Sequence, residues 1–160
     1  MNTAYLLTGG NMGNRKRNLS QAHKLITELC GNISTASSIY ETAAWGKTDQ
    51  PSFLNQALQI KTTLEPEALL KQILKIEKQI GRIREEKYGP RIIDIDILFY
   101  NDEIHKYPQL TLPHPEIQNR RFVLVPMAEI APAFIHPVFK KTIAELLNNC
   151  PDKLEVKKYS

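Results

Sequence analysis

The chain has 160 residues, a length that predicts one globular domain spanning residues 1–160. A hydrophobic fraction of 42%, a charged fraction of 24% and a mean hydropathy of -0.34 exclude a disordered chain, a fibrous repeat and a membrane protein. A net charge of +4 favours an anionic partner but does not indicate which kind. The amino terminus lacks a secretion-signal pattern, and Cys30 and Cys150 fit no metal-binding spacing or disulfide framework. We therefore expect a cytoplasmic protein.

Hydrophobic periodicity and turn residues predict a regular alternation of elements up to residue 100. The expected elements are a strand at residues 5–8, a helix at 18–29, strands at 33–40 and 54–62, a helix at 66–80 and a strand at 92–100. Asn18 and Gln21 match the asparagine form of a capping box at the start of the first helix. Pro66 is a favoured first-turn residue of the second helix, and Gly81 follows its last turn.

The order of these elements is β-α-β-β-α-β, which predicts an α+β fold with a ferredoxin-like core. The rest of the chain is punctuated by prolines, and two short helices are expected in it, near residues 122–130 and 141–149. The expected architecture is therefore a ferredoxin-like core followed by a C-terminal extension of short helices and strands.

Two aspartates interrupt the most strand-like segment of the chain. Because side chains alternate between faces along a strand, the odd-numbered residues 93–99 are expected on one apolar face. Asp94 and Asp96 are expected on the other face, with Ile92 and Leu98. Carboxylates two residues apart lie roughly 7 Å apart along a strand, and magnesium can bind between them and hold polyphosphate oxygens. The alternative is an edge strand with a solvated acidic face.

Basic residues cluster where predicted elements end. The clusters are residues 15–17, 82–91 and 120–121. Arg82, Arg84 and Arg91 flank a long loop beside the aspartates, and guanidinium groups are suited to neutralise charge in phosphoryl transfer. His114, between two prolines, is a candidate to hydrogen-bond a phosphate or a base. The alternatives are an ordinary solvated surface for the arginines and a turn for the histidine.

Aromatic residues gather in the long connection between the second and third strands. Trp45 and Phe53 lie in it, with Tyr40 before them and Asn55 after them. A planar heterocycle can stack between aromatic rings while an amide binds its hydrogen-bonding edge. Simple packing is the alternative for Trp45. The turn at residues 9–13 resembles a phosphate-binding loop but lacks the Lys-Ser/Thr pair of a P-loop, so a tight turn explains it equally well.

Short motifs are spread along nearly the whole chain. They are Gly9-Gly10-Asn11, Asp49-Gln50-Pro51, Phe53-Leu54-Asn55, Gly81-Arg82-Ile83-Arg84, residues 87–98, Leu110-Thr111-Leu112-Pro113-His114, Asn119-Arg120-Arg121-Phe122 and Glu129-Ile130-Ala131-Pro132. In this order they resemble the motifs of the 6-hydroxymethyl-7,8-dihydropterin pyrophosphokinase family of the folate pathway.

The resemblance implies transfer of pyrophosphate from ATP to the hydroxymethyl group of the pterin, with release of AMP and two magnesium ions. Asp94 and Asp96 match catalytic, metal-binding carboxylates, and Arg82 and Arg91 match arginines that assist catalysis on a closing loop. The matched pterin-binding positions are Thr42, Trp45, Phe53, Asn55 and Phe122. The matched ATP-binding positions are Leu70, Glu77, Arg84, Arg91, Ile97, Leu110, Thr111, His114 and Arg120.

The chain departs from the family pattern at four positions. Glu85 stands where a basic residue can contact phosphate, and Tyr88 stands where a tryptophan often covers the pterin. Gln109 and Pro115 replace an arginine and an aromatic residue that help the nucleotide site in some members. These departures bear on ATP affinity and loop closure rather than on the reaction.

Two other functional classes share some of these features. A ferredoxin-like RNA-binding domain needs aromatic residues on its exposed strands, but here the corresponding face carries Asp94 and Asp96. A metal-dependent nuclease leaves the aromatic segment from Trp45 to Asn55 unexplained. The resemblance implies the small molecules ATP and 6-hydroxymethyl-7,8-dihydropterin as partners. We expect a monomer with no nucleic-acid or membrane partner.

Overall fold

The computed structural model describes residues 1–43, 50–81 and 92–159. Its elements in chain order are β1 (Asn2–Gly10), α1 (Arg15–Leu29), β2 (Asn32–Ala36), β3 (Tyr40–Thr42), β4 (Phe53–Thr62), α2 (Pro66–Ile80), β5 (Asp94–Tyr100), β6 (His105–Tyr107), β7 (Leu110–Leu112), a 3-10 helix (Ile117–Asn119), α3 (Arg121–Ile130), α4 (Ile143–Asn148) and β8 (Val156–Lys158). The predicted mixture of helices and strands is confirmed, and short elements follow β5 as expected. None of the described helices has the length and apolar character needed to cross a membrane.

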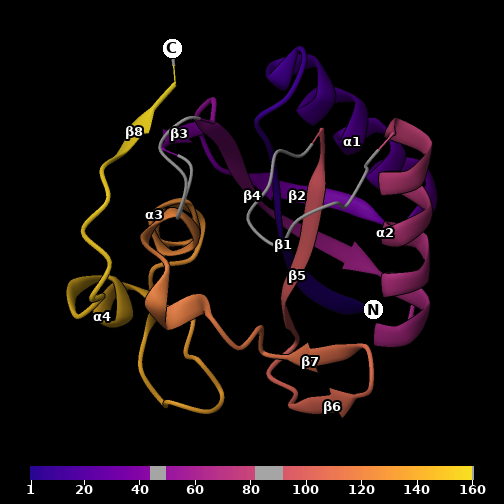
Figure 1. Ribbon diagram of the computed structural model, residues 1–160. Coiled ribbons are helices and arrows are strands. Elements are labelled where there is room, and N and C mark those ends of the chain that lie inside the picture. The colour runs from indigo at the N-terminus through magenta and orange to yellow at the C-terminus, as the bar shows by residue number, and fades with distance from the viewer. Residues whose placement is uncertain (44–49, 82–91, 160) are drawn as a thin grey trace.

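The main sheet is antiparallel and has the strand order β5-β1-β4-β3-β8 (Figure 1). β4 is long enough to pair with β3 at its beginning and with β2 further along. β8 pairs with β3, so the carboxyl-terminal segment extends the sheet. β6 and β7 form a separate hairpin beside β5.

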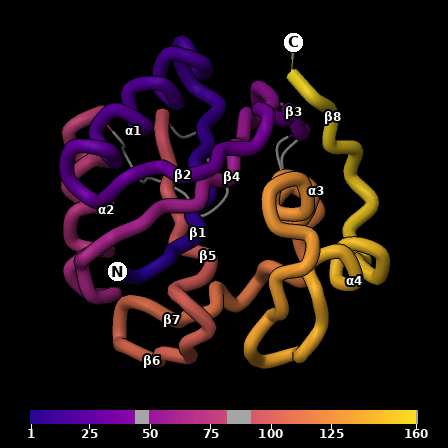
Figure 2. Tube along the Cα trace, turned by 180° about the vertical axis from the view of Figure 1, so that it is seen from behind, coloured from indigo at the N-terminus to yellow at the C-terminus, as the bar shows by residue number. Residues whose placement is uncertain are grey.

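Helices cover both faces of this sheet, as Figures 1 and 2 show. α1 and α2 lie on one face, over an apolar core that includes Leu6, Leu58 and Ile73. α3 and α4 lie on the other face, over a second core that includes Leu7 and Leu124. Because burial of apolar surface is the dominant favourable term in folding, this three-layer packing holds the strands in place.

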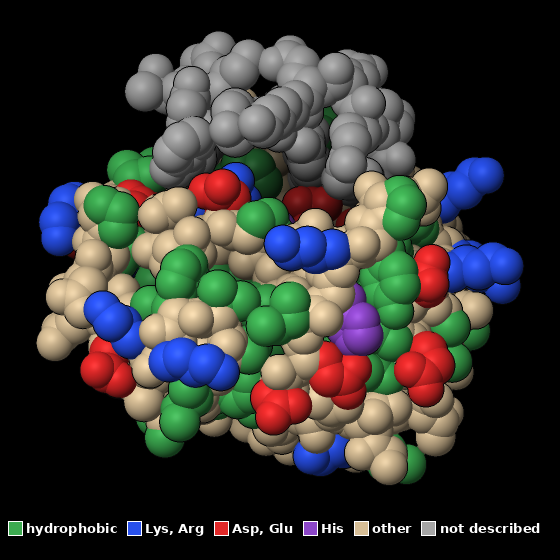
Figure 3. Space-filling model, turned by 90° about the horizontal axis from the view of Figure 1, so that it is seen from below, with side chains coloured by type: hydrophobic (Ala, Val, Ile, Leu, Met, Phe, Trp, Pro, Cys, Tyr) green, Lys and Arg blue, Asp and Glu red, His purple; other side chains and the backbone are tan. Residues whose placement is uncertain are grey.

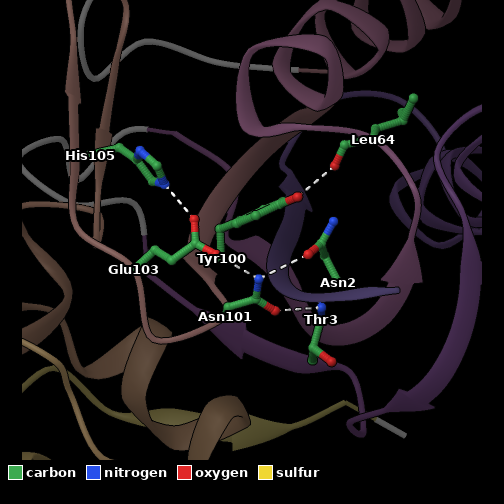
Figure 4. Close-up of polar contacts among 7 residues, drawn as sticks. All are labelled: Asn2, Thr3, Leu64, Tyr100, Asn101, Glu103 and His105. Atoms are coloured by element: carbon green, nitrogen blue, oxygen red, sulfur yellow. Dashed lines mark hydrogen bonds and ion pairs between the residues drawn. The ribbon is translucent and has the colours of Figure 1, made fainter.

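Polar contacts anchor the end of β5 that lies away from Asp94 (Figure 4). The Tyr100 hydroxyl donates to the Leu64 carbonyl at 2.7 Å, and the Asn101 side chain accepts from the Thr3 backbone N–H at 2.9 Å. Asn101 has a φ of 50°, a left-handed conformation that asparagine tolerates better than most residues. These bonds tie β5 to β1 and to the connection before α2.

The first helix begins earlier than predicted. α1 starts at Arg15, and its N-cap is Asn14, whose side chain accepts from the Arg17 backbone N–H at 3.1 Å. The Asn18 amide instead donates to the Met12 carbonyl at 3.1 Å. The predicted capping box at Asn18 is therefore wrong, because more than one asparagine near the helix start suits the cap pattern. In contrast, Pro66 and Gly81 bound α2 as predicted.

The segment predicted as one strand at residues 33–40 forms two strands. β2 and β3 pair with different parts of β4. Between them, the Ser37 hydroxyl accepts from the Ala57 backbone N–H at 2.9 Å, in place of a regular ladder bond. The break lets β3 stand apart from β2 and pair with the beginning of β4.

β5 contains an extra residue. Tyr5 pairs with Phe99 while Leu6 pairs with Ile97, so Leu98 is inserted between the two pairs as a bulge. The predicted single apolar face at residues 93–99 is therefore wrong at Phe99, which lies in the core under α3, whereas Ile97 lies under α1 and α2. The two aspartates precede the bulge and keep the alternation predicted for them.

Candidate functional site

The sheet face under α3 brings together several predicted pterin and metal positions. Asp94 pairs with Gly9, and Gly9 pairs with Asn55. Thr42 pairs with Phe53, two residues before Asn55 and therefore on the same face. Neighbouring strands lie about 4.8 Å apart, so Asp94 and Asn55 lie roughly 10 Å apart, with the Gly9 backbone between them.

Gly9 lies between Asp94 and Asn55 and leaves room for the Asn55 amide, because it carries no side chain of its own. A Cβ at this position would lie 2.1 Å from Asn55 Nδ2 and 2.9 Å from the Leu54 carbonyl oxygen. Any side chain here would therefore displace the Asn55 amide. The sequence pattern indicated only a turn at residues 9–13, although a glycine inside a strand is a known signal of close backbone approach.

Two buried polar atoms of this site have no hydrogen-bond partner within the described part of the chain. They are Thr42 Oγ1 and Asn55 Oδ1, whose side chains are 4% and 6% exposed. Asn55 Nδ2 lies 3.5 Å from the Thr8 carbonyl oxygen, a long contact for a hydrogen bond. An unsatisfied buried polar group costs about 1–3 kcal/mol. These two atoms are therefore suited to a polar ligand that enters the site.

The amino end of α3 contributes an aromatic ring and a guanidinium group. Phe122 lies in the first turn of the helix and packs, half-buried, against the core under α3. Arg120 is the N-cap residue, and its guanidinium carbon lies 5.9 Å from the centre of the Phe122 ring. α3 itself packs on β4 and β3. The helix thus places a stacking surface and a cation at the same side of the sheet as Asn55 and Thr42.

The two aspartates lie half-buried at the start of β5. Between them, the Ile95 backbone N–H donates to Glu77 Oε2 at 2.7 Å, so the buried Glu77 joins α2 to this edge strand. The described residues contain no group of three or more His, Cys, Asp or Glu side chains placed to hold a metal ion. Magnesium needs only one or two carboxylates when phosphates and water complete its shell, so Asp94 and Asp96 have the right donor chemistry.

His114 lies within electrostatic reach of Asp94 and Arg120. Its backbone N–H donates to the Leu98 carbonyl at 3.0 Å, and its ring Nδ1 accepts from the Glu116 backbone N–H at 3.2 Å. Burial and then the charge of Arg120 lower the pKa of His114 to about 4, against the opposite effect of the two carboxylates Glu116 and Asp94. The ring is therefore neutral at pH 7 and presents an Nε2–H donor.

Four other predicted ATP-binding residues lie on or near β5, and three of them belong to or pack against the core under α1 and α2. Ile97 is buried in the core under α1 and α2, and Leu70 and Leu110 pack against the same core. Thr111 is exposed on β7, beside β5. The structure thus gathers these positions on the β5, α2 and β7 side, away from the pterin positions on β3 and β4.

Several predicted positions fall outside the described residues. They are Trp45, Arg82, Arg84 and Arg91 among the site residues, and Glu85 and Tyr88 among the departures from the family pattern. Gln109 and Pro115, the other two departures, are both exposed. The described site therefore consists of the sheet face, the amino end of α3 and the β5 side.

The family model of 7,8-dihydro-6-hydroxymethylpterin-pyrophosphokinase (HPPK) matches residues 5–132 of the chain. This chain belongs to the HPPK family. It is therefore a pyrophosphokinase that acts on hydroxymethyldihydropterin in folate biosynthesis. The HPPK match spans every site residue predicted above and ends before α4 and β8.

Individual relatives agree with this assignment. The 2-amino-4-hydroxy-6-hydroxymethyldihydropteridine pyrophosphokinase of Aquifex aeolicus is 43% identical, over 91% of this chain and 90% of its own length. A folic acid synthesis protein of Dictyostelium discoideum is 40% identical over 94% of this chain, which spans 23% of that protein. The crystal structure of wild-type HPPK-DHPS from Plasmodium falciparum superposes with a TM-score of 0.74 at 21% identity, over 93% of this chain and 43% of that chain. The chain thus spans less than half of the last two proteins, and the last comparison shows the shared fold.

Proposed function

We propose that the site on the α3 face of the sheet binds 6-hydroxymethyl-7,8-dihydropterin beside ATP and transfers the terminal diphosphate of ATP to the pterin hydroxyl. The observation that carries this proposal is the row formed by Asn55, Gly9 and Asp94. Among the described residues, a buried amide with an unpartnered oxygen lies two strands from a carboxylate, and Gly9 adds no side chain between them. The amide suits the edge of a heterocycle, and the carboxylate suits a metal ion that carries phosphates.

The proposed pterin pocket combines polar groups on the sheet with an aromatic ring on the helix. Thr42 and Asn55 supply hydrogen-bonding atoms that are otherwise buried without partners in the described structure. Phe53 lines the pocket from β4, and Phe122 supplies the stacking surface from α3. Trp45 is assigned to the same pocket by its match to the family.

Asp94 and Asp96 are proposed to hold magnesium, with two ions implied by the family. Both carboxylates are half-buried, on the same face and at the same end of β5. When bound, magnesium would neutralise phosphate charge and lower the pKa of the attacking hydroxyl. No described side chain is placed as an obvious general base, because His114 already accepts a backbone hydrogen bond at Nδ1.

In the proposed reaction, the pterin hydroxyl oxygen attacks the β-phosphorus of ATP. A new oxygen–phosphorus bond forms, the bond from the β-phosphorus to the α,β-bridging oxygen breaks, and AMP leaves with that oxygen. The hydroxyl proton passes to solvent. Arg82 and Arg91, assigned by family resemblance, offset the charge on AMP and on the transferred group.

The ATP site is proposed on the β5 side of the molecule. We assign Arg120 and the Nε2–H of His114 to a phosphate or ribose there, because the two groups are close enough to interact electrostatically. Further residues are proposed on the positions described above or on family resemblance: Leu70, Glu77, Arg84, Ile97, Leu110 and Thr111.

Asp96→Ala tests the metal assignment. We expect AMP formation to fall by roughly a hundredfold or more, because the charge on the phosphates is no longer neutralised. AMP is measured from ATP with and without the pterin and with and without magnesium, and circular dichroism verifies the fold. Asp102→Ala, at an exposed position just after β5, is the matched control. Near-normal AMP release by Asp96→Ala would contradict the metal assignment, and ADP as the product would contradict attack at the β-phosphorus.

We also propose a fold type, a cellular location, an oligomeric state and the classes of partner. The strand order β5-β1-β4 with β2 beside β4 supports a ferredoxin-like core within a single domain of residues 1–160. The buried free thiols of Cys30 and Cys150 are compatible with the reducing cytoplasm. We propose a monomer that binds small molecules and neither nucleic acid nor membrane. α3 packs on the sheet face that an RNA-binding domain of this shape would use.

A further inference from the structure

Glu129, near the carboxyl end of α3, joins this helix to the segment between β2 and β3. Its two carboxylate oxygens accept from the Ser38 backbone N–H at 3.1 and 3.0 Å. One of them also accepts from the Ser38 hydroxyl at 3.0 Å, and the other accepts from the Tyr40 hydroxyl at 2.6 Å. The contacts span 91 and 89 residues of sequence. They are therefore tertiary contacts between a helix and the sheet.

The electrostatics of this cluster favour the ionised carboxylate. Burial acts to raise the pKa of Glu129, but the hydrogen bonds from Tyr40 and Ser38 hold it below its usual value. Burial and the neighbouring Glu129 raise the pKa of Tyr40 to about 12. The pair is thus a carboxylate and a neutral phenol at any ordinary pH, and such a charge-assisted hydrogen bond is among the strong ones.

The two ends of this contact belong to the elements that form the proposed pterin pocket. Glu129 lies seven residues after Phe122 in α3, which is about two helical turns, so the two share a face of the helix. Tyr40 lies two residues before Thr42 in β3 and pairs with Asn55 in β4. Figures 1 and 2 both show α3 beside β3. The contact therefore connects the helix that carries Phe122 to the strands that carry Thr42 and Asn55.

We propose that Glu129 is a positioning residue of the pterin pocket. By holding α3 to Ser38 and Tyr40, it sets the gap between Phe122 above and Thr42 and Asn55 below. The proposal rests on the proposed pterin site. Glu129 touches no substrate in this scheme. It instead affects the fraction of ligand-free molecules whose pocket has the width needed to bind the pterin.

This role predicts a separation between binding and turnover. When only a fraction of molecules has the competent pocket, the apparent dissociation constant for the ligand rises by the inverse of that fraction. The bound complex is unchanged, so turnover at saturation is kept. A residue of the catalytic machinery would instead lower turnover itself.

Three variants grade the loss of this contact. Glu129→Ala removes every hydrogen bond of the carboxylate, Glu129→Gln keeps the shape and one acceptor oxygen, and Tyr40→Phe removes a single hydroxyl. We expect the pterin KM and its equilibrium dissociation constant to rise about tenfold for Glu129→Ala, with kcat within about twofold of wild type. For Glu129→Gln and for Tyr40→Phe we expect increases between those of wild type and Glu129→Ala. In the double variant of these two, the increase in the dissociation constant should be smaller than the product of the two single increases.

Glu145→Gln is the matched control. Glu145 also accepts a backbone N–H, from Thr142 at 2.9 Å, but it caps α4 outside the site. We expect this variant to lower the melting temperature without changing the pterin dissociation constant.

The proposal is overturned if Glu129→Ala and Tyr40→Phe keep the pterin dissociation constant within twofold, or if kcat falls while that constant stays unchanged. If Glu129→Ala does not fold, Tyr40→Phe and Glu129→Gln decide. Wild-type enzyme that forms no AMP would contradict the proposed function instead, and pterin binding at equilibrium would still test the positioning role.

Discussion

The site depends on a few residues whose side-chain size or unpaired polar atoms are explained, within the described structure, by a ligand site. Within residues 1–43, 50–81 and 92–159, Thr42 and Asn55 each bury a polar atom without a hydrogen-bond partner, which is costly unless a ligand supplies one. Gly9 has no side chain because the Asn55 amide occupies that space. Substitutions of these residues therefore have effects that follow from geometry rather than from charge.

Gly9→Ala is expected to displace the Asn55 amide and to destabilise the protein by about 1–3 kcal/mol through overpacking. Pterin affinity should fall with it, because the displaced amide no longer faces the pocket. Isothermal titration with the pterin and urea unfolding measure the two effects. Gly31→Ala is the control, since its Cβ would lie 2.2 Å from the Lys61 carbonyl oxygen, far from the pocket. If both variants lose stability equally and bind pterin equally well, the role assigned to Gly9 is wrong.

Among the elements, the start of α1 and the residues between β1 and α1 are held in place by contacts with segments distant in the sequence. Arg15, in a basic cluster that suggested phosphate binding, pairs with Glu41 at 2.7 Å and donates to the Ser52 carbonyl at 2.9 Å. The Asn11 amide donates to the Pro51 carbonyl at 3.0 Å. The start of α1 is thus tied to β3 and to the residues just before β4.

Asn14→Ala should lower the free energy of unfolding by about 1 kcal/mol, because the Arg17 backbone N–H loses its cap. For a protein of this size, the melting temperature should fall by about 2–4 °C. Thermal unfolding followed by circular dichroism measures the shift. Asn18→Ala should cost less, since its amide contact with Met12 is exposed and alanine favours the helix interior. A larger loss for Asn18→Ala would restore Asn18 as the more important cap.

Two histidines that are neutral in the folded protein, His114 and His136, couple the stability of the whole molecule to pH. His136 is 2% exposed, and its Nδ1 accepts from the Val138 and Phe139 backbone N–H groups at 3.1 and 3.2 Å. Burial lowers the pKa of His136 to about 4, and the pKa of His114 is lowered to the same value. In both cases the unfolded chain binds a proton more readily than the folded protein does.

The free energy of unfolding should therefore be fully developed above about pH 6.5 and decrease as the pH falls towards 4. We expect a loss of roughly 1–2 kcal/mol for each histidine by pH 5. Urea unfolding at pH 7 and pH 5 measures it. His136→Asn, whose Oδ1 can replace Nδ1 as the acceptor, should reduce the difference between the two pH values. Equal stability at pH 7 and pH 5 in the wild-type protein would contradict this account.

Local patterns in the sequence predict the class of fold, the approximate elements and the family. Periodicity located α2, and Pro66 and Gly81 bounded it correctly because both residues act through local backbone geometry. The resemblance to the pyrophosphokinases was carried by short motifs, and the match over residues 5–132 confirms it. Asp94 and Asp96 share a face because alternation along a strand is also local.

The way in which these elements meet depends on contacts between segments that are distant in the chain. The bulge at Leu98 depends on how β5 aligns with β1, and it moves Phe99 to the core under α3. The close approach at Gly9 depends on the neighbouring strand, and the contact of Glu129 with Tyr40 joins residues 89 positions apart. Register and helix docking are set by packing between distant segments, which no local pattern in the chain encodes.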